Sequence, residues 1–295
     1  MPAGQLMGNK TERIFILTAV LLVGLALLIT VSAGGLGTGE TGQTPAMLWA
    51  MTGALIVIAD TGSLWVTTGA RTSANAGGTL PGTRLWFLPI PLDMVLPGLT
   101  ALGFVLFIQL FESGAAQIGV LVLAAVTFGA LFWAEAHSQR TSGAYFGLAQ
   151  TVLNVAAHVC AFLLFSTIYA LKLRSAYSST ATGLVTFLLI FELLSRDAAW
   201  HTALSQPVQG RKSIIALLSI VAALLVGELT WALNYWAALT TLVGGAFLLV
   251  TFYIISGILS HYVDRSLTRR LMLEFGVVGA VAIVAVFTSA FLGLD

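Results

Sequence analysis

Nine long apolar runs follow one another along the chain, with only short connections between them. An α-helix needs about 20 apolar residues to cross the hydrocarbon core of a bilayer. Backbone groups in lipid must find their hydrogen bonds within the spanning structure, which excludes open strands. The sequence therefore predicts an all-α, polytopic transmembrane helical bundle of about nine spans, at roughly 14–33, 46–67, 85–110, 117–133, 144–171, 178–194, 213–236, 239–259 and 271–292.

Composition supports the same class. The 295 residues are 58% hydrophobic and 8% charged, whereas a soluble domain carries about 25% charge. No connection is long enough for a soluble domain, so residues 1–295 are expected to form a single transmembrane domain. The net charge of +1 argues against a nucleic-acid partner. The expected surroundings are the lipid bilayer and, as possible partners, other membrane subunits.

The distribution of Lys and Arg predicts the orientation. With the N-terminus inside, the outer loops hold only Lys172 and Arg174. Cytoplasmic loops carry the excess of basic residues, so this split predicts a multi-pass protein of the cell inner membrane. Residues 1–13 would be a short cytoplasmic N-terminus, and Asp295 would lie outside. The inner basic residues are Lys10, Arg13, Arg71, Arg84, Arg140, Arg196, Arg211, Lys212, Arg265, Arg269 and Arg270.

The first span, 14–33, has an alternative interpretation. Lys10 and Arg13 precede the apolar run, and Val31, Ser32 and Ala33 end it before Gly34. Basic residues, an apolar stretch and small residues in this order are also typical of a cleaved signal peptide. The run is long for a signal peptide, so a retained membrane anchor is the preferred interpretation.

Four ionisable residues fall deep within the predicted spans. Counting about 1.5 Å per residue from each span centre places His158 near the midplane. Asp60 and Glu192 fall about 5–6 Å toward the inner side, and Glu228 about 5 Å toward the outer side. Ionisable groups at such depth are costly and usually face other protein groups. We therefore expect them at similar depth within the bundle.

A polar stripe on the fifth span adds to this group. Gln150, Asn154 and His158 are spaced four residues apart and so share one helix face. Lipid would leave their polar groups unsatisfied, so the stripe is expected to face protein. With Glu192 and Glu228 on neighbouring spans, it predicts an intramembrane polar cluster. Such a cluster serves either as a structural clasp or as a proton relay or ion site.

The predicted polar cluster consists of Asp60, Gln150, Asn154, His158, Glu192 and Glu228. The most specific prediction within it concerns Glu228. An unpaired carboxylate at that depth loses more hydration than a single neighbour returns. Glu228 is therefore expected to be protonated, or bonded directly to a partner on the fifth or sixth span. The deep basic group available to it is His158.

Three histidines at the inner ends of spans are weak candidates for metal ligands. His137, His201 and His261 each have a carboxylate two to four residues away, and such ligands suit zinc or iron. No dense metal motif is present, so the preferred interpretation is solvated residues, with no metal and no cofactor. Nucleotide-binding and hydrolase signatures are also lacking in the sequence. An enzyme that uses these histidines is therefore the weakest of the functional interpretations.

Four stretches carry a resemblance to a known family. They are "VLPGLTALG" (95–103), "AAHVCAFLL" (156–164), "GELTWALNYW" (227–236) and "SHYVDRSLTRRLMLEF" (260–275). Together they span about residues 85 to 285, with gaps. The chain resembles a family of uncharacterised bacterial multi-pass membrane proteins, classified as a domain of unknown function. The resemblance implies a helical membrane protein and supplies no activity or site.

The sequence thus favours a non-enzymatic integral membrane protein, a scaffold or an accessory subunit of a membrane complex. Very small loops and the lack of catalytic motifs support this interpretation. The alternative is a proton- or ion-coupled small-molecule transporter with the buried carboxylates and His158 in its pathway.

Overall fold

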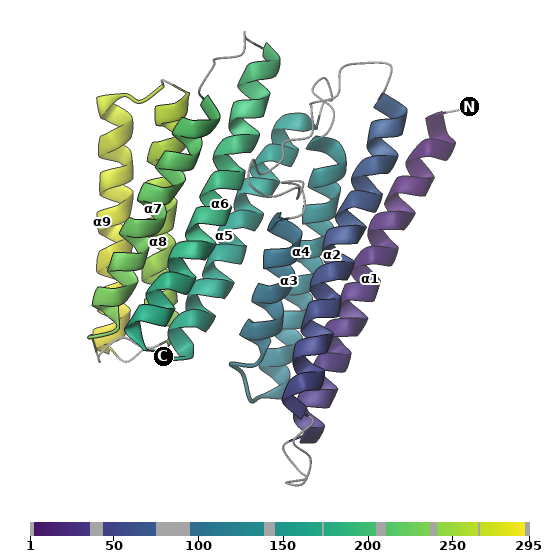
Figure 1. Ribbon diagram of the computed structural model, residues 1–295, viewed down its shortest axis with the longest axis horizontal. Coiled ribbons are helices and arrows are strands. Elements are labelled where there is room, and N and C mark those ends of the chain that lie inside the picture. Colours follow the sequence, from purple (N-terminus) through teal and green to yellow (C-terminus); the bar gives the residue numbers. More distant parts are fainter. Residues whose placement is uncertain are drawn as a thin grey trace. The chain divides into compact units, whose positions relative to one another are not determined.

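The computed structural model describes residues 3–35, 44–74, 95–138, 145–172, 174–204, 211–236, 241–264 and 266–292. Within these ranges the chain forms nine α-helices and no strand, so the predicted all-α fold is confirmed. Each predicted span contains or overlaps one helix (Figure 1), and residues 85–94 of the predicted span 85–110 lie outside the described residues. The helices are α1 (Ala3–Gly35), α2 (Thr44–Ala74), α3 (Val95–Ile108), α4 (Gly114–Ser138), α5 (Phe146–Ala170), α6 (Ser175–Leu204), α7 (Arg211–Leu233), α8 (Thr241–Val263) and α9 (Arg269–Leu292).

Seven of the described helices are long and apolar enough to cross a membrane. The other two are α3 and α9. α3 has 14 residues and is therefore about 21 Å long, which is short of the hydrocarbon thickness. α9 has 24 residues, and side chains near its C-terminal end lie outside the described part of the chain in which spans were identified. The described residues therefore establish nine helices, with spanning length and apolarity shown for seven of them.

The chain divides into two compact units, Met1–Ala156 and Ala157–Asp295, and the boundary falls within α5. In the first unit, α1 packs against α2, α3 and α4, and α2 packs against α3 and α4 (Figure 1). α1 contributes a buried stripe at four- and three-residue spacing, formed by Leu17, Leu21, Leu25 and Leu28. This spacing marks the helix face that contacts protein.

The second unit is organised around the α6–α7 pair, the most extensive helix contact in the described chain. A Cβ added at Gly183 of α6 would lie 3.2 Å from the Ala223 carbonyl oxygen of α7. A Cβ added at Gly227 of α7 would lie 3.2 Å from the Ser179 carbonyl oxygen of α6. Small residues four apart on both helices thus let the two backbones approach closely, as is common between transmembrane helices.

The carboxyl-terminal half of α5 packs on α8 within the second unit. Phe165 and Phe252 have ring centroids 5.9 Å apart. Tyr169 lies over Gly244, and its hydroxyl donates to the Leu233 carbonyl at the end of α7 over 3.2 Å. α8 also packs against α9, where Phe275 occupies the space beside Gly257.

Candidate functional site

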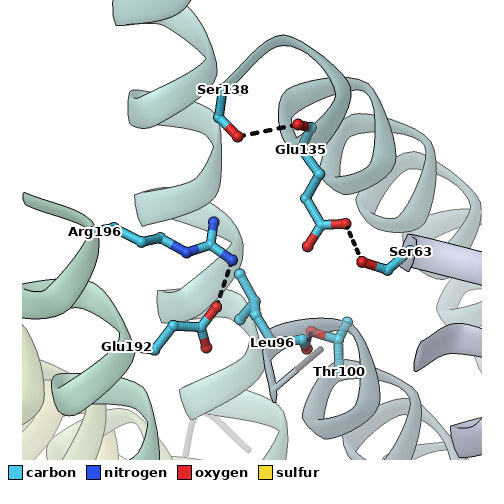
Figure 2. A network of polar contacts seen from close by, with 7 residues as sticks. All are labelled: Ser63, Leu96, Thr100, Glu135, Ser138, Glu192 and Arg196. Atoms are coloured by element: carbon cyan, nitrogen blue, oxygen red, sulfur yellow. Dashed lines mark hydrogen bonds and ion pairs between the residues drawn. The ribbon is translucent and has the colours of Figure 1, made fainter. Parts of the chain in front are cut away.

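Glu135 of α4 is the most deeply buried carboxyl group among the described residues of the first unit. Its residue is 1% exposed, and Ser63 of α2, which is fully buried, donates from Oγ to Glu135 Oε2 over 2.7 Å (Figure 2). The Ser138 hydroxyl donates to the Glu135 backbone carbonyl over 3.0 Å. A hydrogen bond to a buried charged group contributes about 1.5–3 kcal/mol. This contact therefore fastens α4 to α2.

Asp60 of α2 faces the first turn of α3. Gly98 lies against the Asp60 carboxyl group, and Asp60 Oδ1 is buried without a hydrogen bond to a described residue. A Cβ at position 98 would lie 2.5 Å from Oδ1, so only glycine leaves room for the carboxyl group. The nearby Thr100 hydroxyl donates to the Leu96 carbonyl over 2.7 Å (Figure 2). The Asp60 carboxyl group thus lies against the first turn of α3, where the helix dipole favours a negative charge.

In the second unit, Glu192 of α6 forms an ion pair within its own helix. Its Oε1 lies 2.5 Å from Arg196 Nη2, one turn further on (Figure 2). Their side chains are 3% and 14% exposed, respectively. Burial of Glu192 agrees with the sequence-based expectation, whereas its pairing with Arg196 was not considered there. The four-residue spacing of Glu192 and Arg196 could have predicted the pair, because residues four apart are neighbours on a helix surface.

His158 of α5 is half-buried against α8. Its Nε2 lies 3.4 Å from the Ser256 hydroxyl. Its ring meets Phe252 at a centroid distance of 5.3 Å and Tyr253 at 5.7 Å. Because Ser256 donates its proton to the Tyr253 carbonyl over 3.1 Å, its oxygen is left to accept from the imidazole. Within the second unit, His158 thus lies among aromatic rings and beside the Ser256 hydroxyl.

The remainder of the polar stripe on α5 consists of Gln150 and Asn154. Gln150 is half-buried like His158, but Asn154 is exposed. The residues that α5 buries near Asn154 are the apolar Leu153, Ala156 and Ala157. The expectation that the whole stripe faces protein stays a prediction at Asn154, which lies beside the boundary of the two units.

Glu228 of α7 lacks the direct partner that was one of its two expected outcomes, and its protonation stays a prediction. It is exposed, and its carboxyl group makes no hydrogen bond or ion pair with a described residue. The reason lies in the face that α7 turns toward α6. Ala223 and Gly227 occupy that close contact, and the next residue along an α-helix points about 100° away from Gly227. Glu228 is thus directed outward and not toward a partner on α5 or α6.

Within each unit, the predicted polar residues have the following contacts. Asp60 belongs to the first unit, beside Gly98. In the second unit, Glu192 binds Arg196, His158 contacts Ser256, and Glu228 lies on an outer face. Sequence reasoning did not find the contact between Glu135 and Ser63, because one serine among many small residues gives no signal of its own.

The weak metal candidates have ordinary partners where they are described. His137 Nδ1 lies 2.7 Å from the Trp133 carbonyl, and His261 Nδ1 lies 2.9 Å from the Ser266 hydroxyl. The side chain of His201 lies outside the described residues. Among the side chains that the structure describes, no group of three or more His, Cys, Asp or Glu is placed to hold a metal ion.

A groove of about 800 Å³ runs between α1 and α4 in the first unit. On α1 it extends from Thr11 to Leu22, and on α4 from Ala125 to His137. Its α4 wall includes Gly129, where an added Cβ would meet no atom within 4 Å. Sequence reasoning did not predict this groove. The signal was the small residues of α4, which hydropathy does not register.

Comparison with known proteins decides the family. The family described as "Protein of unknown function (DUF5656)" matches residues 29–289, most of the chain. The chain belongs to the DUF5656 family. This confirms the resemblance to an uncharacterised family, and no curated protein and no solved structure matches the chain. The DUF5656 match includes the α4 wall of the groove and begins after its α1 wall, which ends at Leu22.

Proposed function

We propose that this protein is a non-enzymatic accessory or scaffold subunit of a complex in the cell inner membrane. Its partner would be a transmembrane helix of another protein, bound to the outer face of α7. The observation that carries the proposal is Glu228, exposed at membrane depth in an otherwise apolar helix. The spanning part of α7 is Ser213–Leu233, so Glu228 lies about 7.5 Å from its middle.

The exposed residues around Glu228 follow a regular spacing. They recur at intervals of four and three residues, which is the seam pattern of packed helices. Leu217 and Leu224 of this set are each 61% exposed, and Trp231 is 51% exposed. We call the set the α7 stripe: Leu217, Val221, Leu224, Glu228, Trp231 and Tyr235.

Lipid alone is a poor neighbour for this stripe. A charged side chain at the bilayer centre costs about 2.5–3.5 kcal/mol on insertion scales. A basic group on a partner helix would offset that cost by direct pairing. If the Glu228 side chain extended toward the bilayer surface, the free-energy cost of insertion would fall too. That would not explain why the exposed residues of α7 recur at the spacing of packed helices. The proposal therefore specifies a partner with Lys or Arg at the depth of Glu228.

A second copy of this chain is a weaker candidate for the partner. A symmetric contact would place two Glu228 carboxyl groups opposite each other, and like charges repel. The arginines in the described membrane spans are already engaged. Arg13 lies 4.9 Å from the centroid of the Trp65 ring, and Arg196 binds Glu192.

The test compares Glu228→Gln with Glu274→Gln. Both changes keep the side-chain size and remove the charge, and Glu274 is exposed on α9, where it pairs with Arg270. Complexes from native membranes would be sized by native electrophoresis, and a photoreactive residue at position 224 would report contact with the partner. We expect Glu228→Gln to weaken the complex and the crosslink, while Glu274→Gln leaves both unchanged. A complex unaffected by Glu228→Gln, or one that contains only this chain, would overturn the proposal.

The proposed orientation keeps the N-terminus in the cytoplasm and α1 in the membrane. It rests on the Lys and Arg distribution. Retention of α1 as an anchor is supported by its buried leucines, from Leu17 to Leu28, which pack within the first unit. Cysteines placed at Gly37, Ser113 and Asp295 should react with an impermeant reagent from outside. Labelling of position 295 from the cytoplasm would mean an even number of spans.

A proton- or ion-coupled transporter is the second candidate function. The observations that favour it are the buried carboxyl groups of Glu135 and Glu192. Buried ionisable groups in membrane helices often line a pathway for ions or protons. In proteoliposomes with a pH-sensitive dye, this candidate expects a proton flux that Glu192→Gln abolishes without unfolding the protein. Absence of flux in the unmodified protein would exclude proton coupling and favour the scaffold.

A further inference from the structure

We propose that the groove between α1 and α4 binds the acyl chain of one membrane phospholipid. The headgroup of that lipid would lie at the end formed by Thr11 and His137. The groove lies wholly within the first unit, on helices that pack against each other. It is separate from the α7 stripe, so this proposal does not depend on the proposed function.

The dimensions of the groove suit one lipid chain. The stretch from Thr11 to Leu22 is about 16 Å long along α1, and that from Ala125 to His137 is about 18 Å long along α4. The hydrocarbon core is about 30 Å thick, so each leaflet contributes about 15 Å. The groove is therefore as long as one leaflet is deep, and its 800 Å³ falls in the usual range for small-molecule sites.

The groove is polar mainly at one end, as a lipid is. Thr11 and His137 line that end. Because His137 Nδ1 is bonded to the Trp133 carbonyl, Nε2 is the ring nitrogen left for a headgroup. The walls beyond it are formed largely by apolar residues such as Ile14, Leu22 and Ala125.

An aromatic cluster indicates where the polar end lies in the bilayer. Trp133 and His137 stack with centroids 4.6 Å apart, and Tyr145 meets Trp133 at 6.2 Å and His137 at 6.0 Å. Trp and Tyr gather at membrane interfaces, where one side of the ring is apolar and the other is hydrated. Thr11 and His137 are thus at headgroup level, and the groove descends from there into the hydrocarbon.

One polar atom further along the groove also lacks a partner. Thr18 lines the groove, and its Oγ1 is buried without a hydrogen bond to a described residue. Threonine hydroxyls in helices usually donate to the carbonyl four residues earlier, as Thr167 does to Leu163. The groove thus carries one further polar atom, on Thr18, about 10 Å along α1 from Thr11.

The test uses the full chain in vesicles of phosphatidylethanolamine and phosphatidylglycerol. Photoreactive phosphatidylglycerol would carry a diazirine either near the carboxyl end or near the methyl end of one acyl chain. Mass spectrometry would then locate the crosslinked residues. We expect the first lipid to label α1 and α4 near Thr11 and His137, and the second to label them near Leu22 and Ala125. Equal labelling of all exposed helix faces by both lipids would overturn the proposal.

A matched pair of variants completes the test. Gly129→Leu places a side chain in the groove, whereas Gly119→Leu makes the same change on the exposed part of α4 outside it. A Cβ meets no atom within 4 Å at either position. Crosslinking to the groove should fall about tenfold in Gly129→Leu and stay unchanged in Gly119→Leu. Unchanged crosslinking in Gly129→Leu, or a crosslink between two chains through the groove, would contradict the proposal. If Gly129→Leu fails to fold, the depth-dependent labelling of the unmodified chain still decides.

Discussion

Two helix pairs in this protein use small residues with opposite results. In the α6–α7 pair, Gly183 and Gly227 each lie against a backbone carbonyl of the other helix. In the α1–α4 pair, Gly129 has no atom within 4 Å of its Cβ position, and a groove remains. Small residues close a helix pair only where they face small residues on the other helix. On α1, the residues that line the groove include Ile14, Phe15 and Leu22.

The largest expected effect is the loss of the close contact in Gly227→Leu. A Cβ there would lie 3.2 Å from the Ser179 carbonyl and 3.9 Å from Gly183 Cα. Backbone atoms cannot give way as a side chain does, so we expect a loss of about 3 kcal/mol in the free energy of unfolding. The same change at Gly129 should stay within about 0.5 kcal/mol. Reversible unfolding in detergent would measure both, and equal effects would end the distinction between the two pairs.

A smaller effect should follow from Ser63→Ala, which tests what holds α4 beside its groove. The change removes the donor to Glu135 Oε2 and leaves a buried acceptor atom less well satisfied. We expect a loss of about 2 kcal/mol in the free energy of unfolding. Thr61→Ala is the control, because the exposed Thr61 hydroxyl bonds only to its own helix. A loss no larger than that of the control would mean that α4 is fixed by packing alone.

The smallest effect should come from Asn234→Ala, which asks whether polar contacts add to the α6–α7 pair. Asn234 Nδ2 donates to the Ser178 hydroxyl over 2.5 Å, near the end of α7. A neutral hydrogen bond contributes about 1 kcal/mol, so the unfolding free energy should fall by about that amount. Thermal unfolding would measure it beside Gly227→Leu. If Asn234→Ala lowered the unfolding free energy as much as Gly227→Leu does, the hydrogen bond near the helix ends would contribute as much to the α6–α7 pair as the glycine contacts.

The helices themselves were predictable from the sequence, because hydrophobic length is the dominant signal for spanning segments. The predicted run at 117–133 lies within α4, and that at 178–194 lies within α6. Both helices extend further because polar residues at their ends, such as Glu135 and Arg196, find partners. Hydropathy treats such residues as the end of a span.

Which way each helix faces was not predictable from hydropathy. Lipid and protein interior are equally apolar, so an apolar residue favours neither side. Glu228 was therefore expected to face inward, although Ala223 and Gly227 turn the other face toward α6. The four-residue spacing of small residues would have been the better guide. Glu192 was placed correctly in the interior, and its partner Arg196 was one turn away in the sequence.

The close α6–α7 contact has a consequence for how the chain is made. Only residues 205–210 separate the two helices, so their pairing closes a very short loop. Contacts between neighbours in sequence form early and fast, because little chain entropy is lost. We therefore expect α6 and α7 to enter the bilayer as a preformed hairpin during synthesis. In that order of events, Glu228 already lies on the face of α7 that points away from α6 before α8 and α9 have been translated.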